Sequence, residues 1–317
     1  MDLLFVADPL EHFKTYKDTT FAMMRVAARR GHAIWACGPE QLVWQRGGRV
    51  TAQGARRIAL TGDAQAWFTV AAQRDYAVAD AGAVLMRKDP PFDSEYFYAT
   101  HLLQQAEREG ARVFNKPAAL RDHPEKLAIL EFPEHIAPTL VTRSEAAIRA
   151  FHAEHHDIIL KPLDGMGGMG IFRVGPDGLN LGAIVETLNK GGAQTVMVQR
   201  FIPEIAAGDK RVLVIGGVPV PYCLARIPQG GEVRGNLAAG GKGVAQALSP
   251  ADRAIAEAIG PRLAARGLLL IGLDVIGDRL TEINVTSPTC FQEITEQTGC
   301  DVAALFVDAL EAASAAA

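Results

Sequence analysis

Glu282 and Asn284 carry side-chain oxygen atoms and stand two residues apart in the otherwise apolar run 280–285. Alternate side chains of a strand share one face, so a strand here would point both in the same direction. Carboxylate and amide oxygens are ligands that Mg²⁺ prefers, and this ion usually also takes phosphate oxygens from a substrate. The spacing predicts a magnesium site that serves a nucleotide. The alternative is a solvent-facing polar stripe on an edge hairpin.

A third acid, Asp274, lies in the preceding apolar run 268–276, and residues 277–279 follow as a turn. The two runs together predict a β-hairpin. A three-residue turn would place Asp274 opposite Glu282, whereas a two-residue turn would shift the register by one residue and send Asp274 to the other face. A metal set of Asp274, Glu282 and Asn284 therefore depends on the three-residue turn.

A glycine-rich segment separates two further apolar runs, the first of which ends in Lys161. It contains Gly165, Met166, Gly167 and Gly168. Glycine has no Cβ, so backbone N–H groups there can approach phosphate oxygens closely. A strand pattern and not a helix follows the glycines, which excludes both the P-loop and the dinucleotide fingerprint. The segment predicts a glycine-rich hairpin over nucleotide phosphates, as in kinases. The alternative is an ordinary flexible hairpin.

Lys126 follows a group of residues that is typical of a helix start. Asp122 suits the N-cap, Pro124 the first turn and Glu125 the acid of a capping box. Lys126 is then expected in the first or second turn of a helix. A lysine there opposes the helix dipole, which indicates a use outside the helix, such as binding a phosphate.

Two strand-like runs carry arginines near their ends, Arg211 in the run 209–215 and Arg226 in the run 221–228. The guanidinium fork suits phosphate or carboxylate oxygens. The following segment, 227–243, is too rich in glycine for stable structure and too charged to be buried, and it carries Arg234. We expect this segment to be a mobile lid that excludes water from a reactive intermediate.

The first part of the chain alternates strand and helix signals. Runs 3–7 and 33–37 are typical of strands, and Asp18 and Gly31 mark the start and the stop of a helix between them. This βαβ unit predicts a parallel sheet.

Arg87 follows the strand-like run 83–86, at a carboxyl strand end, where open α/β sheets place ligands. We therefore favour a clamp on a substrate carboxylate over a surface ion pair with Asp89 or Asp93. Lys17, just before the first helix, is a second candidate for the same substrate.

Composition is that of a soluble intracellular enzyme. The chain has 317 residues, of which 49% are hydrophobic, enough for two or three domains. A net charge of −4 without a broad basic surface argues against a nucleic-acid partner. The four cysteines form no C-x-x-C pair, which favours reduced thiols in a cytosol over disulfides or zinc. No signal peptide or membrane-length apolar run is apparent, so we expect a cytoplasmic protein without membrane contact.

Taken in order, these segments resemble the ATP-grasp carboxylate–amine ligases and, more closely, the bacterial glutathione synthetases. The resemblance runs over almost the whole chain and rests on residues 87–93 (RKDPPFD), 161–168 (KPLDGMGG), 226–231 (RIPQGG) and 281–289 (TEINVTSPT). Met169 and Gly170 depart from it, because other small residues are common there. The resemblance implies an N-terminal βαβ domain with a parallel sheet, residues 1–122, followed by a two-lobed α/β ATP-grasp fold. Its small lobe would span 123–200 and its large lobe, with the metal site and the lid, 201–317.

The resemblance also assigns roles to individual residues. Arg211 and Arg226 would be catalytic, stabilising the transferring phosphoryl group and the tetrahedral intermediate. Asp274, Glu282 and Asn284 would hold Mg²⁺, with Mn²⁺ as an alternative ion. Contacts with ATP would come from Lys126, Lys161, Gly165, Met166, Gly167, Gly168, Gln199, Arg200, Phe201, Ile202, Asp209, Arg234 and Gly241. Substrate contacts would come from Lys17, Arg87, Ser287 and Thr289. For residues 199–202, which would line the adenine, a plain strand end is the alternative.

The implied reaction is the ATP-dependent joining of γ-glutamylcysteine and glycine to glutathione, through an acyl phosphate, in a homodimer or homotetramer. Two other hypotheses stay open at this point. One is a sister ligase that joins D-alanines or adds glutamate to a protein end. The other is a nucleotide-binding module that keeps the shape without turnover, although such a module does not need the full set of transfer groups.

Overall fold

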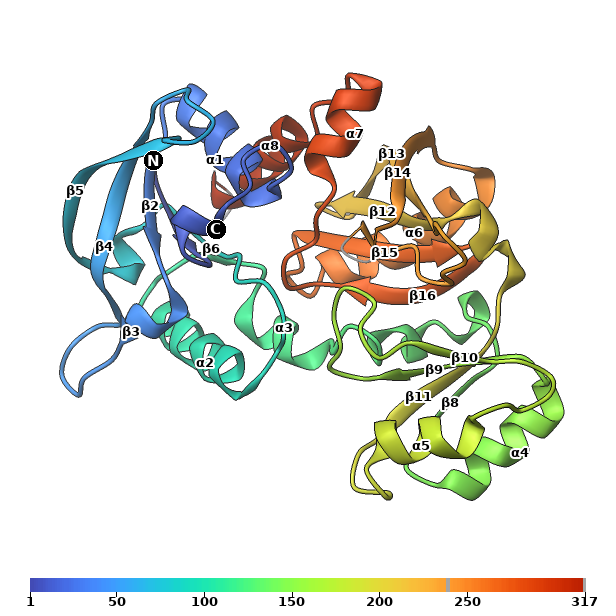
Figure 1. Ribbon diagram of the computed structural model, residues 1–317. Coiled ribbons are helices and arrows are strands. Elements are labelled where there is room, and N and C mark those ends of the chain that lie inside the picture. Colours follow the sequence, from blue (N-terminus) through green and yellow to red (C-terminus); the bar gives the residue numbers. More distant parts are fainter. Residues whose placement is uncertain (238–239, 316–317) are drawn as a thin grey trace.

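The computed structural model describes residues 1–237 and 240–315, which form three β-sheets with helices packed around them (Figure 1). The strands are β1 Asp2–Val6, β2 Ala33–Cys37, β3 Leu42–Val43, β4 Thr51–Leu60, β5 Phe68–Ala77, β6 Ala83–Met86, β7 Val113–Phe114, β8 Thr139–Thr142, β9 Ile158–Pro162, β10 Phe172–Val174, β11 Val196–Arg200, β12 Asp209–Ile215, β13 Val218–Ile227, β14 Lys242–Ala247, β15 Leu270–Ile276 and β16 Arg279–Asn284. The α-helices are α1 Thr19–Arg29, α2 Ser94–Arg108, α3 Pro117–Asp122, α4 Glu145–His155, α5 Leu181–Asn189, α6 Pro250–Ala264, α7 Phe291–Thr298 and α8 Val302–Ala315.

The N-terminal sheet has the strand order β3-β4-β2-β1-β6-β7, with β5 paired to β4. Strands β2, β1, β6 and β7 are parallel, which confirms the predicted βαβ unit. Asp18 caps α1 by accepting a hydrogen bond of 2.7 Å from the N–H of Phe21. The antiparallel β4–β5 hairpin was not predicted. Two register shifts interrupt it, so that the buried residues Ala52, Ala55 and Ile58 of β4 do not alternate as a regular strand would.

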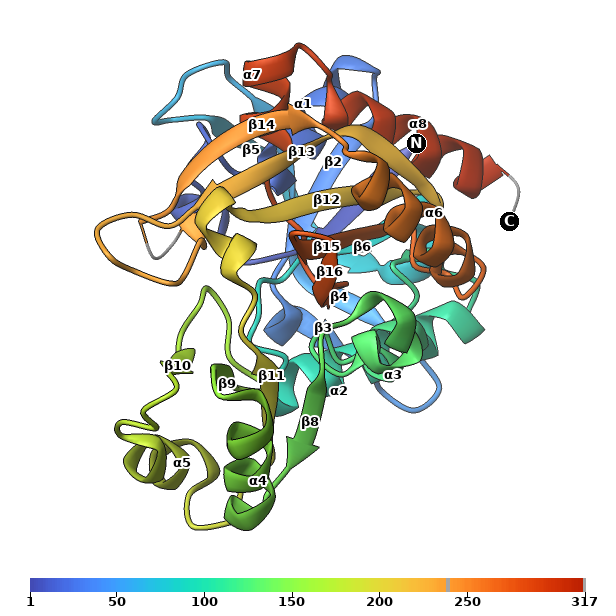
Figure 2. The ribbon, with the colours of Figure 1, turned by 90° about the vertical axis from the view of Figure 1, so that its right-hand side faces the viewer.

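The second sheet is antiparallel, with the order β10-β9-β11-β8. Helices α4 and α5 cover one face (Figure 2). Their buried side chains, among them Ile148 and Val185, pack with Leu160 and Val198 into a small separate core. Pairing of β9 with β10 confirms the predicted hairpin around the glycine-rich loop.

The third sheet is also antiparallel, with the order β14-β13-β12-β15-β16. It contains the four strands predicted to carry the arginines and the acids. Helix α6 packs against β12, β13 and β15. Strands β13 and β14 take in the two ends of the predicted lid, 227–243, and the middle of that segment, Ala238 and Ala239, lies outside the described residues.

The prediction of a helix that begins near Asp122 and contains Lys126 is wrong. Helix α3 ends at Asp122, residues 125–127 form a turn, and a 3₁₀ helix, Ala128–Glu131, follows. The expected capping acid, Glu125, instead accepts hydrogen bonds from Val285 and Thr286, residues distant in the sequence. Tertiary contacts have therefore overridden the local capping signal.

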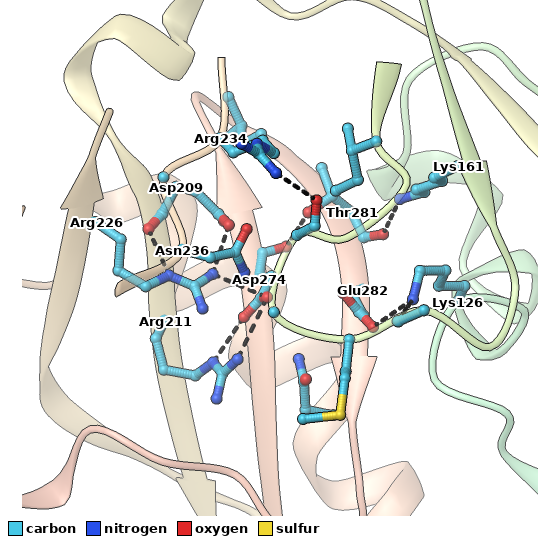
Figure 3. Close-up of a pocket in the computed structure, with 18 of the residues that line it drawn as sticks. Lys126, Lys161, Asp209, Arg211, Arg226, Arg234, Asn236, Asp274, Thr281 and Glu282 are labelled. Carbon is cyan, nitrogen blue, oxygen red and sulfur yellow. Dashed lines mark hydrogen bonds and ion pairs between the residues drawn. The ribbon is translucent and has the colours of Figure 1, made fainter. Parts of the chain in front are cut away.

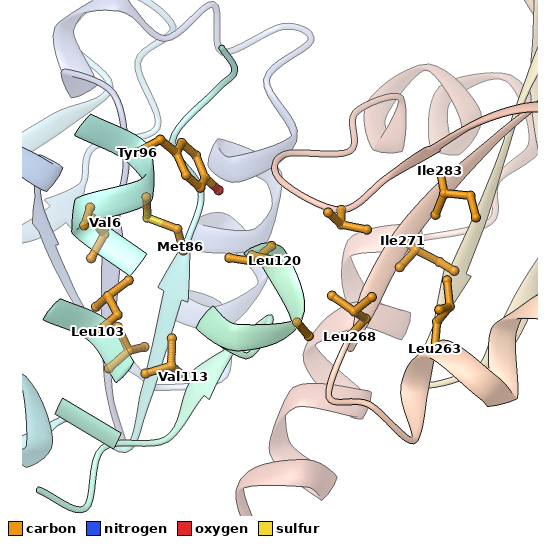
Figure 4. Close-up of a cluster of buried hydrophobic side chains, with 14 of the residues drawn as sticks. Val6, Met86, Tyr96, Leu103, Val113, Leu120, Leu263, Leu268, Ile271 and Ile283 are labelled. Carbon is orange, nitrogen blue, oxygen red and sulfur yellow. The ribbon is translucent and has the colours of Figure 1, made fainter. Parts of the chain in front are cut away.

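A continuous hydrophobic cluster joins the N-terminal sheet to the third sheet (Figure 4). Val6, Met86 and Leu103 lie on its N-terminal side, and Leu268 and Ile283 on the other. The C-terminal helix α8 returns to pack on α1 (Figure 1). Because the cluster between the N-terminal sheet and the third sheet is apolar, it holds these two sheets in a defined relative geometry. Within the two described ranges, no helix is long and apolar enough to cross a membrane.

Candidate active site

One large pocket lies between the glycine-rich hairpin and the third sheet (Figure 3). It brings together most of the residues predicted for the site: Lys126, Lys161, Gly165, Met166, Gly167, Gly168, Gln199, Arg200, Phe201, Ile202, Asp209, Arg211, Arg226, Arg234, Asp274, Glu282, Asn284, Ser287 and Thr289. Three predicted residues, Lys17, Arg87 and Gly241, do not line it. Positively charged and acidic side chains thus face each other across one cavity.

The β15–β16 hairpin places Asp274 directly opposite Glu282, as predicted, but not through the predicted turn. Ile276 pairs with Arg279, so the turn has two residues. A register shift follows, with Thr281 as the extra residue of a β-bulge between the pairs Val275–Leu280 and Asp274–Glu282. The bulge cancels the shift that the two-residue turn would cause, and the acids keep a common face.

Two arginines and two acids form a buried cluster on this face (Figure 3). Arg211 Nε lies 2.6 Å from Asp274 Oδ1. Arg226 Nη2 bridges two carboxylates, at 2.5 Å from Asp209 Oδ2 and 2.8 Å from Asp274 Oδ2. Burial opposes the charged form of Asp274, but the charges of Arg211 and Arg226 outweigh it and lower its pKa.

Asp209 is less well compensated than Asp274. Burial raises its pKa to about 6, against the charge of Arg226. Its Oδ1 is buried and has no hydrogen-bond partner in the part of the chain that the structure describes. An unpaired buried acceptor is costly, so this oxygen fits a donor or a cation supplied by a ligand.

Two buried lysines approach the sheet from the opposite wall (Figure 3). Lys126 Nζ lies 2.5 Å from the carbonyl oxygen of Gly165 and 3.3 Å from Glu282 Oε1. Lys161 Nζ donates to the carbonyl oxygen of Thr281, at 3.0 Å. Burial lowers the pKa of Lys161 to about 8, with the charge of Glu282 opposing the shift. Both lysines therefore bring a buried positive charge to the lining of the pocket.

This pKa predicts a pH dependence of nucleotide binding. Below pH 8 Lys161 is charged and would attract a phosphate group, and above pH 8 the free protein loses that charge. We expect the KM for ATP to rise between pH 7 and 9.5, by at most about tenfold per unit above pH 8. In Lys161→Arg, whose guanidinium stays charged, the profile should be flatter. Identical profiles in the two proteins would exclude Lys161 from this role.

The donor chemistry around Glu282 fits a hard divalent cation. The Glu282 side chain keeps 21% of its surface exposed and, with Asn284, faces the pocket. Asp274 stands beside them but is already paired with two arginines. Across residues 1–237 and 240–315, no three His, Cys, Asp or Glu side chains cluster as a metal site. An ion would therefore need the amide of Asn284 and phosphate oxygens as well.

The predicted adenine wall, residues 199–202, lines the pocket. Gln199 Nε2 donates to Thr139 Oγ1 at 2.9 Å, and the N–H of Phe201 donates to the carbonyl oxygen of Asp157 at 2.9 Å. The guanidinium of Arg173 lies 3.7 Å from the centre of the Phe201 ring and is itself held by Asp157. The wall is thus rigid and partly aromatic, which suits a base.

The lid contacts the glycine-rich loop. Arg234 Nη1 lies 3.4 Å from the carbonyl oxygen of Gly168. A Cβ added to Gly168 would stand 2.7 Å from Asn236 Oδ1, and one added to Gly241 would stand 2.0 Å from the carbonyl oxygen of Gly235. Gly241 therefore does not contact the cavity but permits the close backbone packing that folds the lid.

Gly241→Ala tests the lid. The added methyl group cannot fit against Gly235, so we expect the lid to stay open and water to reach the reactive intermediate. More than one phosphate should then be released per product molecule formed, measured by parallel phosphate and product assays. Gly231→Asn is the matched control, because no described atom lies within 4 Å of a Cβ added to Gly231 and asparagine tolerates its positive φ. Unchanged coupling in Gly241→Ala would contradict the lid role.

Arg87 is buried, with 5% of its surface exposed, and lies just behind the pocket. Its Nε donates to Thr20 Oγ1 at 3.1 Å and its Nη2 to the carbonyl oxygen of Pro288 at 3.2 Å. Neither Asp89 nor Asp93 forms an ion pair with it, so the surface-pair alternative is wrong. Burial lowers the pKa of Arg87. Lys17, by contrast, is exposed.

Sequence reasoning missed several residues that line the pocket, among them Glu125, Asn236, Thr281 and Cys290. Thr281 and Asn236 lie in segments already assigned to the metal strand and the lid, so position could have indicated them. Glu125 was assigned to a helix cap. Burial, and then the charge of Glu282, raise the pKa of Glu125.

A glycine-rich hairpin facing an antiparallel sheet with paired arginines and acids defines an ATP-grasp protein. Solved structures agree. The chain is similar to the D-cycloserine synthetase DcsG, with a TM-score of 0.67, 15% identity, and coverage of 99% of this chain and 100% of that one. It is also similar to the ATP-grasp ligase PsnB in complex with a minimal precursor, Mg and ADP, with a TM-score of 0.62, 20% identity, and coverage of 99% and 96%.

Sequence comparison narrows the class. Residues 1–121 match the prokaryotic glutathione synthetase N-terminal domain, and residues 125–299 match the prokaryotic glutathione synthetase ATP-grasp domain. The glutathione synthetase of Ralstonia nicotianae is 61% identical over 99% of this chain and 96% of its own length. That of Neisseria meningitidis serogroup B is 58% identical over 98% of each. The chain belongs to the prokaryotic glutathione synthetase family.

Proposed function

We propose that this protein joins γ-glutamylcysteine and glycine to form glutathione, with ATP converted to ADP and phosphate. The observation that carries the proposal is the single pocket in which Arg211 and Arg226 face Lys126, Lys161 and Glu282. Such a set binds phosphates and stabilises negative charge as it moves from ATP to a carboxylate. Membership of the family supplies the substrates.

The reaction would proceed in two steps. The γ-phosphoryl group passes from ATP to the substrate carboxylate, which yields an acyl phosphate and ADP. The amine of glycine then attacks the acyl carbon, and phosphate leaves. Lys126 and Lys161 would bind the phosphates, and Arg211 and Arg226 would stabilise the oxygens that become more negative in each step. No nucleophilic side chain is required.

Glu282 and Asn284, with Asp274 beside them, would hold Mg²⁺. When bound, the ion would supply positive charge that offsets the negative charge of the phosphate oxygens. Gly165 to Gly168, Asp209, Arg234 and the wall 199–202 would enclose the nucleotide. The mixed oxygen set also suits Mn²⁺ as an alternative ion.

Arg87 would bind a carboxylate of γ-glutamylcysteine, next to Ser287 and Thr289. In the described part of the chain its guanidinium has no carboxylate within ion-pair distance, and an unpaired buried charge is strongly unfavourable. A substrate anion would supply the missing charge.

Arg87→Met should raise the KM for γ-glutamylcysteine about 30-fold or more, since breaking a buried charge pair costs about 2–5 kcal/mol, while the KM for ATP stays unchanged. Steady-state kinetics with each substrate varied in turn measures this. Arg46→Met, on an exposed loop, is the control. An equal rise in both KM values would instead make Arg87 a structural tie between Thr20 and Pro288.

Phosphate release by the purified protein with ATP and Mg²⁺ tests the function. We expect release that requires both γ-glutamylcysteine and glycine, with glutathione detected by mass. Release with D-alanine alone would assign a sister ligase. Nucleotide binding without release under every condition would assign a non-catalytic module.

We infer a cytoplasmic enzyme that acts as a homodimer or homotetramer, with domains at 1–122, 123–200 and 201–317. Strand β5 supports self-association, because it is an exposed edge strand, and such edges readily pair with another chain. Light scattering measures the oligomeric state, and a monomer at micromolar concentration would contradict it.

A further inference from the structure

The turn at residues 125–127 is hydrogen-bonded to strand β16, which carries the predicted metal ligands, and to the residues that follow it. The carbonyl oxygen of Glu125 accepts a hydrogen bond of 3.0 Å from the N–H of Ile283. Its Oε1 accepts from the N–H groups of Val285 and Thr286, at 3.0 and 3.1 Å, and from Thr286 Oγ1, at 2.8 Å. One glutamate thus makes four hydrogen bonds to the end of β16 and the segment after it.

These bonds surround the residues that face the cavity. Asn284 lies between Ile283 and Val285, whose N–H groups donate to Glu125. Ser287 and Thr289, which also line the pocket, come shortly after. The next residue after Glu125, Lys126, pairs with Glu282, at 3.3 Å. The turn therefore contacts residues 282, 283, 285 and 286. It is distant from them in the sequence, because it lies between α3 and the 3₁₀ helix Ala128–Glu131.

A buried carboxylate at position 125 is energetically unfavourable, because burial and a neighbouring negative charge both oppose its charged form. Glu125 lines the same pocket as Glu282, whose like charge repels it, and within residues 1–237 and 240–315 no cation forms an ion pair with it. The hydrogen bonds of a charged acceptor are about twice as strong as neutral ones, which offsets part of this cost. A neutral side chain would serve packing alone equally well.

We propose that Glu125 is a positioning residue for the metal and substrate face: by fixing the backbone of Val285 and Thr286, it holds Asn284 on one side and Ser287 on the other in the geometry that binds Mg²⁺-nucleotide. The inference rests on the proposed function. It assigns no contact between Glu125 and the reacting atoms. Residues that orient metal ligands in this way typically affect metal affinity or activity by about 10–100-fold.

Three variants test it. Glu125→Ala removes all three bonds to Oε1, Glu125→Gln keeps an acceptor oxygen without charge, and Thr286→Val removes one bond. Calorimetric titration of Mg·ADP into each protein measures binding without turnover, and the Mg²⁺ concentration for half-maximal activity is measured alongside. We expect Glu125→Ala to lower the affinity for Mg·ADP, and to raise the Mg²⁺ concentration for half-maximal activity, by about 10–100-fold each. Glu125→Gln and Thr286→Val should each change both quantities in the same directions by about three- to tenfold.

Glu134→Gln, an exposed glutamate nearby, is the matched control and should behave as wild type. A lower melting temperature in Glu125→Ala with wild-type Mg·ADP binding would overturn the proposal, because that pattern is a purely structural role. If Glu125→Ala does not fold, unchanged Mg²⁺ dependence in Thr286→Val overturns it. The titration still decides the role of Glu125 if even the wild-type protein forms no glutathione, so the two failures are distinguishable.

Discussion

Replacing Glu282 with alanine should reduce kcat by about 10³-fold or more while the fold stays intact. The carboxylate supplies the central charge of the predicted cation site, and such an ion contributes several kcal/mol to phosphoryl transfer, each 1.4 kcal/mol being about tenfold in rate. Glu282 is partly exposed and contributes nothing to the hydrophobic core, which its neighbours Leu280 and Ile283 form. The fold should therefore stay intact, and the stability cost should be limited to the loss of the Lys126–Glu282 ion pair.

The measurement is kcat at increasing Mg²⁺, with the melting temperature taken from circular dichroism. Glu282→Gln keeps the shape and one oxygen but not the charge, and it should be almost as impaired. Glu257→Gln, an exposed glutamate on α6, should match wild type. Near-normal kcat of Glu282→Ala at saturating Mg²⁺ would remove Glu282 from the site.

Arg226→Met should both inactivate and destabilise the protein. Arg226 contacts two buried carboxylates. Among the described residues, its loss leaves Asp209 Oδ2 without a partner and Asp274 paired with Arg211 alone. Breaking a buried pair on one side costs about 3–5 kcal/mol of unfolding free energy. A cation that stabilises transferring phosphoryl groups contributes about 10³–10⁵ to kcat, and we expect a loss in that range.

The destabilisation should depend on pH. Burial already raises the pKa of Asp209 to about 6, from an ordinary value of 3.8, and removal of Arg226 raises it further. A carboxyl with a raised folded-state pKa binds its proton more tightly when folded, so its stabilising contribution is complete below about pH 4 and is lost as the pH rises through the folded pKa. Asp274 acts in the same direction, because loss of one arginine weakens the effect that lowers its pKa. The deficit of Arg226→Met should thus be larger at pH 8 than at pH 4.5.

Denaturant unfolding at several pH values measures this deficit. The double variant Asp209→Asn with Arg226→Met removes the unpaired acid together with the arginine. It should recover part of the stability, with a flatter pH profile, but none of the activity. A deficit that is the same at pH 4.5 and pH 8 would contradict the assignment of the cost to Asp209 and Asp274.

Sequence reasoning succeeded where a pattern and its structural cause lie close together. The apolar runs around Asp274 and Glu282 form the predicted strands, and the glycines after Lys161 form the predicted hairpin, because period-two alternation and turn residues act locally. The βαβ unit followed from Asp18 as a cap and Gly31 as a stop for the same reason.

It failed where distant contacts outweigh local preference. The capping pattern at Asp122 is sound as a local signal, but Glu125 forms stronger bonds with Val285 and Thr286 and no helix begins there. The irregular burial of β4 hid the β4–β5 hairpin. The β15–β16 hairpin has the two-residue turn that was expected to exclude Asp274 from the shared face. The bulge at Thr281, which no local pattern indicated, restores the register.

The sequence by itself determined that this protein has residue types suited to binding phosphates, cations and carboxylates, and on which strands and loops they lie. Only the tertiary structure decided that Arg226 bridges Asp209 and Asp274, that Lys126 pairs with Glu282, and that Arg87 is buried with no ion pair among the described residues. Those outcomes depend on packing between segments far apart in the chain. Burial and the neighbouring charges then determine the protonation state of each carboxyl group, because they raise or lower its pKa relative to its value in water.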